Sequence, residues 1–115
     1  MKKTICIALA VAVLLICAGC GSTRAEGLSD RAYERALAAL ETADEYIAST
    51  ITGDKALENL DRALALIESC DGENDILLET AVFNLRYAIS QKDQGTGTMS
   101  KVEDLRDSLA DLLGK

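Results

Sequence analysis

The side chains that most often do chemistry in enzymes are scarce in this chain. It has 115 residues, no histidine and four cysteines, Cys6, Cys17, Cys20 and Cys70. Without histidine, the Ser-His-Asp and Cys-His nucleophile systems cannot be assembled, and neither can a zinc site built on histidine. The phosphate-binding patterns G-x-x-x-x-G-K-[ST] and G-x-G-x-x-G are also missing from the sequence. We therefore expect no catalytic residues, no metal site and no cofactor.

Residues 71–75, Asp-Gly-Glu-Asn-Asp, concentrate oxygen ligands and raise the question of a calcium site. An EF-hand loop beginning at Asp71 would need glycine at its sixth position and an acid at its twelfth. Those positions hold Ile76 and Val82. The segment therefore favours a solvated turn between helices, whose acids complement the positive end of the following helix.

Asp44 interrupts a stripe of apolar residues at helical spacing. A buried carboxylate without a partner is costly, so we expect Asp44 to be paired or to point outward. Arg86 is the candidate partner if the first and third predicted helices are adjacent. The alternative is an enzyme that works with carboxylates alone, combining Asp44 with Glu41 or Glu79, and it requires these acids to converge in a cleft.

The N-terminal segment has the order of a secretory signal peptide. Lys2 and Lys3 precede an apolar run over residues 5–16, and Cys17, Ala18 and Gly19 are small. A membrane-spanning helix needs about 20 apolar residues, so this run is short for a permanent span.

The tetrad Cys17-Ala18-Gly19-Cys20 resembles the lipobox of bacterial lipoproteins. The resemblance implies removal of residues 1–19, a diacylglycerol on the sulfur of Cys20 and often a third, palmitate-like chain on its amine. The family prefers leucine where this chain has Cys17, and the alternative is ordinary secretory cleavage that leaves Cys20 a free thiol. Gly21 is not the Asp that retains such proteins at the inner membrane. We expect an anchor in the cell membrane or outer membrane, outside the cytoplasm.

The charge balance is acidic. The formal net charge is −7, and loss of Lys2 and Lys3 with the signal peptide lowers it to −9. Acidic domains are repelled by nucleic-acid phosphates and by anionic lipid headgroups. We therefore expect no nucleic-acid partner, and a domain that stands off the bilayer to which Cys20 tethers it.

Cys70 is the one cysteine left after cleavage and lipidation, so no disulfide can form within a mature chain. It shares the helical register of Ala56 and Ala63, which favours a small buried core residue. The alternative is an intermolecular disulfide in an oxidising compartment.

For the chain beyond the anchor we predict an all-α fold, a small antiparallel bundle of about four helices over residues 29–115. A flexible tether at residues 20–28 is expected to precede it. No proline interrupts it, and Ala, Leu, Glu and Arg favour helix. Gly53 is the expected stop after the first helix, and Ser29, Asp54, Asn74 and Ser100 are the expected N-caps. Apolar spacing predicts helices over residues 30–50, 55–69, 75–92 and 101–113.

The predicted helix at 75–92 is apolar around most of its circumference. It is therefore expected to be the most buried helix or to carry a partner surface. If Phe83 and Tyr87 are exposed together, they form a candidate binding patch.

Two short resemblances lie within the bundle. Residues 34–41 and 61–68 have similar Ala/Leu patterns at an offset of 27, which indicates either duplication or a plain helical hairpin. Residues 43–67 resemble the second helix of a tetratricopeptide repeat, although the tryptophan, Leu-Gly pair and closing proline of that family are missing.

These patterns favour a lipid-anchored docking module that binds an envelope protein. The first alternative is a carrier that holds a small apolar ligand between its helices, in a cavity lined by residues such as Ile76, Phe83 and Ile89. The second is the carboxylate enzyme described above.

Overall fold

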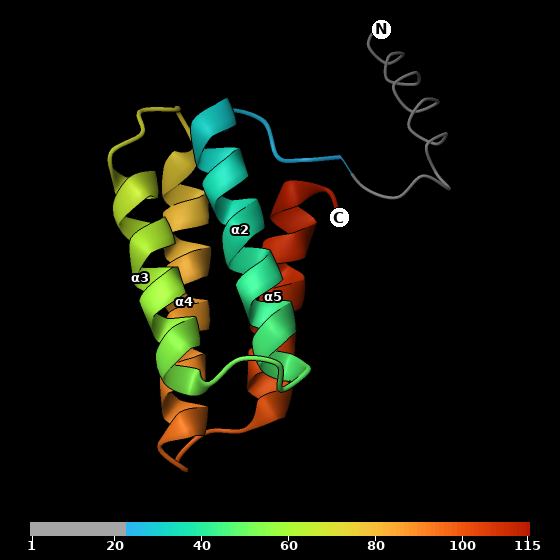
Figure 1. The fold of residues 1–115 in the computed structure, drawn as a ribbon. Helices are drawn as coiled ribbons and strands as arrows, with labels where there is room; N and C mark the ends of the chain where they lie inside the picture. The colour runs from blue at the N-terminus through green and yellow to red at the C-terminus, as the bar shows by residue number, and fades with distance from the viewer. Residues whose placement is uncertain (1–22) are drawn as a thin grey trace, which may run out of the picture.

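The computed structural model describes residues 23–115, so the predicted signal peptide and Cys20 lie outside the described residues. The described chain forms four helices, α2 (Asp30–Ile47), α3 (Gly53–Glu68), α4 (Asp75–Asp93) and α5 (Met99–Leu113). They run alternately up and down and are joined by short connections (Figure 1). The prediction of an all-α antiparallel bundle of four helices is confirmed.

The bundle is closed, with one diagonal contact. Helices adjacent in the chain pack on each other, α5 packs back on α2, and α2 also reaches α4 across the bundle. Four alanines at helical spacing are fully or almost fully buried on α2, and small side chains allow this close approach. They are Ala32, Ala36, Ala39 and Ala43.

The core is aliphatic. Burying each large apolar side chain contributes about 1.5–3 kcal/mol, and no disulfide is present to help within the described residues. Tyr46, on α2, is the one buried aromatic residue in this part of the chain. The largest fully buried side chains are Leu60, Ile67, Leu78, Val82, Leu85, Ile89, Val102, Leu109 and Leu113.

Three helices begin at a hydroxyl N-cap. Ser29 accepts a hydrogen bond from the first turn of α2 at 3.2 Å, as predicted. Thr52 caps α3 and Thr98 caps α5 in the same way. The predicted caps Asp54 and Ser100 are therefore wrong, because a threonine with extended backbone already occupies the cap position two residues earlier.

The prediction that Gly53 ends the first helix is wrong. Gly53 is instead the buried first residue of α3. Helix α2 ends earlier, at Ile47, and is followed by Ser49, whose φ of 64° lies in the left-handed region. The N–H of Thr50 then bonds to the carbonyl of Glu45, and that of Ser49 to Tyr46. This is a Schellman motif built without glycine.

The start of α4 is organised by a buried carboxylate. Asn74 occupies the predicted cap position, but its side chain makes no capping bond. Asp75 is 4% exposed and accepts hydrogen bonds from the N–H of Ser29 at 2.9 Å, the hydroxyl of Ser29 at 2.8 Å and the N–H of Gly72 at 2.7 Å. One side chain thus ties the start of α2 to the turn before α4.

Residues 24–27 lie on the bundle, which corrects the expectation of a flexible tether up to residue 28. The N–H of Ala25 bonds to the carbonyl of Leu112 at 2.8 Å. Asn74 donates from its backbone to Gly27 and from its side chain to Glu26. These bonds attach the segment to the end of α5 and to the turn before α4.

Asp44 is exposed and paired, as expected, but its partner is not Arg86. Its carboxylate accepts hydrogen bonds from Nε and Nη2 of Arg106 on α5, at 2.7 and 3.2 Å. Arg86 instead pairs with Asp61 on α3. The prediction failed because α2 and α4 are diagonal, so an exposed residue of α2 reaches the adjacent α5 rather than α4.

Candidate functional site

Helix α4 carries four large apolar side chains on its surface. Ile76 is 58% exposed, Leu77 42%, Phe83 53% and Tyr87 58%. Between residues 75 and 92, six residues of α4 are exposed, and none of them is charged. We call this surface the α4 face. The α4 face consists of Ile76, Leu77, Thr80, Phe83, Asn84 and Tyr87.

The face follows from helical spacing. Ile76, Thr80, Phe83 and Tyr87 recur at intervals of 4, 3 and 4 residues, which places them on one stripe of a helix. The opposite side of α4 enters the core, where Val82 and Leu85 are fully buried. Helix α4 is therefore apolar on both sides, although the bundle covers only one of them.

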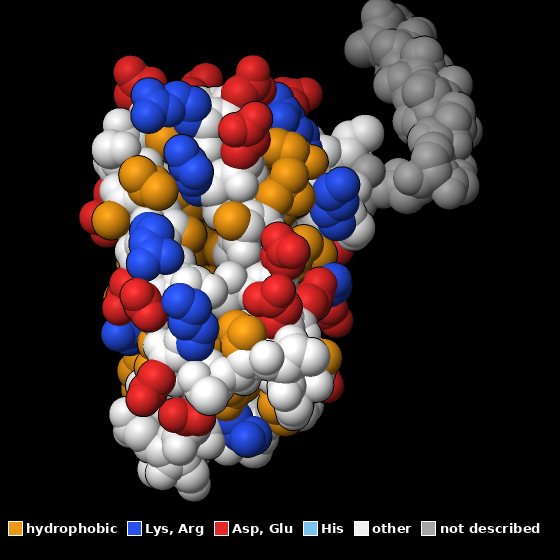
Figure 2. Space-filling view, viewed as in Figure 1, with side chains coloured by type: hydrophobic (Ala, Val, Ile, Leu, Met, Phe, Trp, Pro, Cys, Tyr) orange, Lys and Arg blue, Asp and Glu red, His pale blue; other side chains and the backbone are white. Residues whose placement is uncertain are grey.

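The other helices present charge to solvent. Six of the seven exposed residues of α2, six of seven on α3 and five of seven on α5 are charged, whereas Asp93 is the one charged residue among seven on α4. Figure 2 shows acidic and basic side chains spread over the side of the molecule formed by α2 and α3. The α4 face is thus the surface that lacks the usual solvating residues.

Hollows flank the α4 face on both sides. Towards α3, a hollow of about 150 Å³ is bordered by Leu64, Ile76 and Phe83. Towards α5, Leu77 and Leu105 border a hollow of about 420 Å³, and a further one of about 440 Å³ lies beside Tyr87. The apolar side chains therefore project as ridges between grooves, a shape that another helix can fit.

Charged residues border the face on the α3 side. Partial burial, together with the nearby charge of Glu68, raises the pKa of Glu79 above its ordinary value. About two helical turns further along, Arg86 uses its Nε and Nη2 donors on Asp61. This border thus has an acidic end at Glu79 and a basic end at Arg86.

Phe83 and Tyr87 were predicted as a binding patch on condition that both are exposed, and this condition is met. Leu77, Thr80 and Asn84 were not singled out from the sequence. The available signal was the absence of charge between Glu79 and Arg86, which contrasts with the charged outer positions of the other helices.

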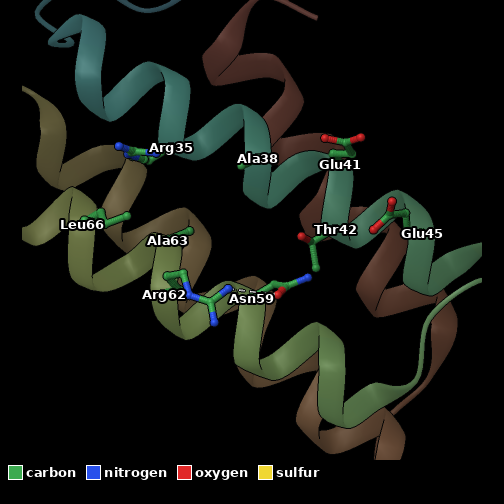
Figure 3. Close-up of a pocket in the computed structure, with 9 residues that line it drawn as sticks. All are labelled: Arg35, Ala38, Glu41, Thr42, Glu45, Asn59, Arg62, Ala63 and Leu66. Atoms are coloured by element: carbon green, nitrogen blue, oxygen red, sulfur yellow. Dashed lines mark hydrogen bonds between the residues drawn. The ribbon is translucent and has the colours of Figure 1, made fainter.

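A second groove, of about 280 Å³, runs between α2 and α3. Thr42 points across it toward Asn59, whereas Glu41 points away from α3 (Figure 3). Arg62 donates to Asn59 at 3.5 Å and pairs with Glu58. The lining combines four charged side chains with polar Thr42 and Asn59 and with alanine and leucine.

The three acids of the carboxylate-enzyme alternative lie in different places. Asp44 is bound to Arg106 on α5, Glu41 borders the α2–α3 groove, and Glu79 borders the hollow between α3 and α4. The convergence that this alternative requires is therefore not found among them.

The residues of the carrier alternative do not line one cavity either. Ile89 is fully buried in the core, whereas Ile76 and Phe83 are more than half exposed on the other side of α4. The sequence could not separate the two sides, because both are apolar.

Cys70 lies just after α3, half-buried against the core, with its thiol directed at the carbonyl of Leu66 at 3.4 Å. Its predicted role as a core residue or in an intermolecular disulfide stays a prediction. In residues 71–75, Asp75 is engaged with Ser29 and Gly72. Among residues 23–115, no group of three acidic, cysteine or histidine side chains is arranged to hold a metal ion.

The fold and this surface define the class, a small up-down four-helix bundle with one uncovered helix face. No protein-family model, curated protein or solved structure matches the chain. None of the helices described for residues 23–115 is both long and apolar enough to cross a bilayer. The lipoprotein and tetratricopeptide resemblances stay predictions.

Proposed function

We propose that this protein is an exported lipoprotein that docks an envelope protein onto the α4 face. Acyl chains on Cys20 hold it at a membrane, and no catalytic step is involved. The observation that carries the docking role is the uncharged, apolar surface of α4 on a molecule whose other helices are covered with charge.

The composition of the α4 face suits a protein partner. Aromatic residues are enriched among the side chains that dominate binding energy in interfaces, and Phe83 and Tyr87 lie one helical turn apart here. Ile76 and Leu77 extend the apolar area, while Thr80 and Asn84 supply hydrogen-bonding groups. Because these side chains are already held on a rigid helix, little conformational entropy is lost when a partner binds.

The docked segment at residues 24–27 shortens the proposed tether. Ala25 is fixed to Leu112 on α5, so residues 21–24 alone connect it to the lipidated Cys20. The five extended residue steps from Cys20 to Ala25 span at most about 18 Å. The anchor would thus keep the α4 face close to the bilayer surface, where envelope proteins are concentrated.

The test is photocrosslinking in the cells that make the protein. A benzoyl-phenylalanine placed at Phe83 is expected to give a discrete adduct with a protein. The same probe at Ala65, an exposed alanine on α3, is expected to give none. Equal labelling at both positions, or at neither, would refute docking through α4.

A further inference from the structure

We infer that the partner of the α4 face is the α4 face of a second copy of this chain, packed antiparallel about a two-fold axis. This inference rests on the proposed function and names the protein that docks. It is carried by the spacing of the stripe, the sizes of the side chains along it and the charges beside it.

The stripe has a spacing that is the same in both directions. Ile76, Thr80, Phe83 and Tyr87 are separated by 4, 3 and 4 residues. An antiparallel second copy can therefore align all four positions at once, with Ile76 opposite Tyr87 and Thr80 opposite Phe83. Each pair sets a smaller side chain against an aromatic one, an alternation of sizes that lets facing layers interdigitate.

The hollows beside the stripe lie where the aromatic rings of the second copy would enter. The hollow between α3 and α4 is bordered by Ile76, Thr80 and Phe83. In the aligned dimer, Ile76 lies opposite Tyr87 of the second copy and Thr80 lies opposite its Phe83, so both aromatic rings come to the border of this hollow. The surface is thus complementary to itself, as an isologous two-fold interface must be.

Charge fixes the direction. Glu79 and Arg86 flank the stripe on the α3 side. In this antiparallel register the α3 sides of the two copies face each other, so Glu79 of each copy lies beside Arg86 of the other. Two equivalent ion pairs result. A parallel alignment would instead bring Glu79 beside Asn84 and would form no ion pair.

In the isolated bundle, both Glu79 and Arg86 can still accept a further ionic partner. Glu79 has the like-charged Glu68 as its neighbour, and a guanidinium in contact with both would relieve the repulsion. The bonds that Arg86 makes with Asp61 use Nε and Nη2. The Nη1 donors make no hydrogen bond within residues 23–115, and arginine can bind a second carboxylate through them.

The pairing is compatible with two lipid anchors in one membrane. The two-fold axis is perpendicular to the plane of the two α4 helices, so α5 of both copies lies on the same side of that plane. Because Ala25 is bonded to Leu112 on α5, both chains leave the dimer toward this side. Both Cys20 residues can then reach the same bilayer.

The test reverses the charges of Glu79 and Arg86 and measures whether two copies associate. Full-length chains with two different tags are extracted in detergent, and co-purification of one tag with the other is measured. Wild-type copies are expected to co-purify. Glu79→Arg alone, or Arg86→Glu alone, should reduce co-purification at least about tenfold, because each sets two like charges together. Mixing the two variants should restore it, since every contact between them is again an opposite pair.

Rescue by mixing separates the interface from folding, because a misfolded variant cannot be rescued by its partner. Glu103→Arg, a reversal on the exposed side of α5, is the matched control and should co-purify like the wild type. Cys70→Ser should also do so, since the proposed contact is not covalent. Failure of the mixture to associate would overturn the antiparallel register.

The dimer and the docking role can fail separately. If the wild-type chain is monomeric in detergent at all concentrations while the probe at Phe83 captures a different protein, the dimer is refuted and docking through α4 stands. If the chain is monomeric and the probe captures nothing, both are refuted. An adduct of twice the chain's mass, formed from Phe83 and not from Ala65, supports the dimer.

Discussion

At the scale of single residues, the buried Asp75 joins two distant segments of the chain through three hydrogen bonds. Burial alone would raise its pKa, but the bonds from the backbone and hydroxyl of Ser29 and from the N–H of Gly72 outweigh that effect and lower the pKa below the ordinary value for Asp. A carboxyl with a lowered pKa in the folded state stabilises the fold above its unfolded pKa. This contribution is lost as the pH falls through the folded pKa.

Asp75→Asn is expected to lower the free energy of unfolding at pH 7 by about 1–3 kcal/mol, because the amide turns an N–H₂ group toward the donors of Ser29 and Gly72. Urea unfolding at pH 7 and at pH 3 measures the effect, with Glu103→Gln as the exposed control. The difference from the wild type should shrink at the lower pH, because the stabilisation by the ionised Asp75 is lost as the pH falls toward its folded-state pKa. A difference that stays constant with pH would contradict this account.

Ser49 has an unusual backbone conformation, with a positive φ. A non-glycine residue in the left-handed region costs of the order of 1 kcal/mol or more, and glycine is favoured at this position of a Schellman motif. Ser49→Gly should therefore raise the free energy of unfolding by about 0.5–1 kcal/mol in thermal or urea unfolding. Ser69→Gly, at the right-handed end of α3, should give no such gain.

At the scale of elements, α4 differs from the other three helices. The hydrophobic residues of α2, α3 and α5 face the bundle and their charged residues face solvent. Helix α4 has apolar residues on both sides, and the bundle uses only one. The proposed dimer would cover the side that the bundle leaves exposed.

Substitutions on the two sides of α4 should therefore have different effects. Leu85→Ala leaves a cavity in the core and should cost about 2–5 kcal/mol of unfolding free energy. Phe83→Ala removes an exposed ring and should change the stability of the monomeric chain by less than about 0.5 kcal/mol, while it abolishes association. Chemical unfolding of both variants at low protein concentration makes the comparison. A large loss of stability from Phe83→Ala would mean that the ring belongs to the core.

At the scale of the whole molecule, the proposed anchor and the α4 face act together. Confinement of two copies to one membrane raises their effective concentration, so a modest contact between helices suffices for pairing. The net acidic charge opposes association in solution. The two Glu79–Arg86 contacts therefore offset this repulsion in the proposed dimer, and tethering raises the fraction of paired chains further.

Cys20→Ser should release the protein from the membrane, because one thioether supplies two acyl chains, and two chains are needed for stable anchoring. Fractionation into membrane and soluble pools measures this, and Cys70→Ser is the matched control. The intact mass of the wild-type protein should correspond to residues 20–115 with a diacylglycerol and, with it, an N-linked acyl chain. A wild-type mass with an unmodified Cys20 would contradict the anchor.

The sequence alone determined the number and approximate bounds of the helices, because apolar spacing and the absence of proline are local signals. It also determined that the core would be aliphatic. Local signals were weaker at the helix ends, where Thr52 and Asp54, or Thr98 and Ser100, compete for the same cap. Which one is used depends on the path of the connecting loop.

Only the tertiary structure decided which residues meet. Asp44 reaches Arg106 rather than Arg86, because α5 and not α4 is the neighbour of α2. Asp75 bonds to Ser29, which is far away in the chain. The two apolar sides of α4 look alike in the sequence, and packing alone selects which of them becomes the core. The other side is left as a surface because a bundle of four helices can cover each helix on its inner side only.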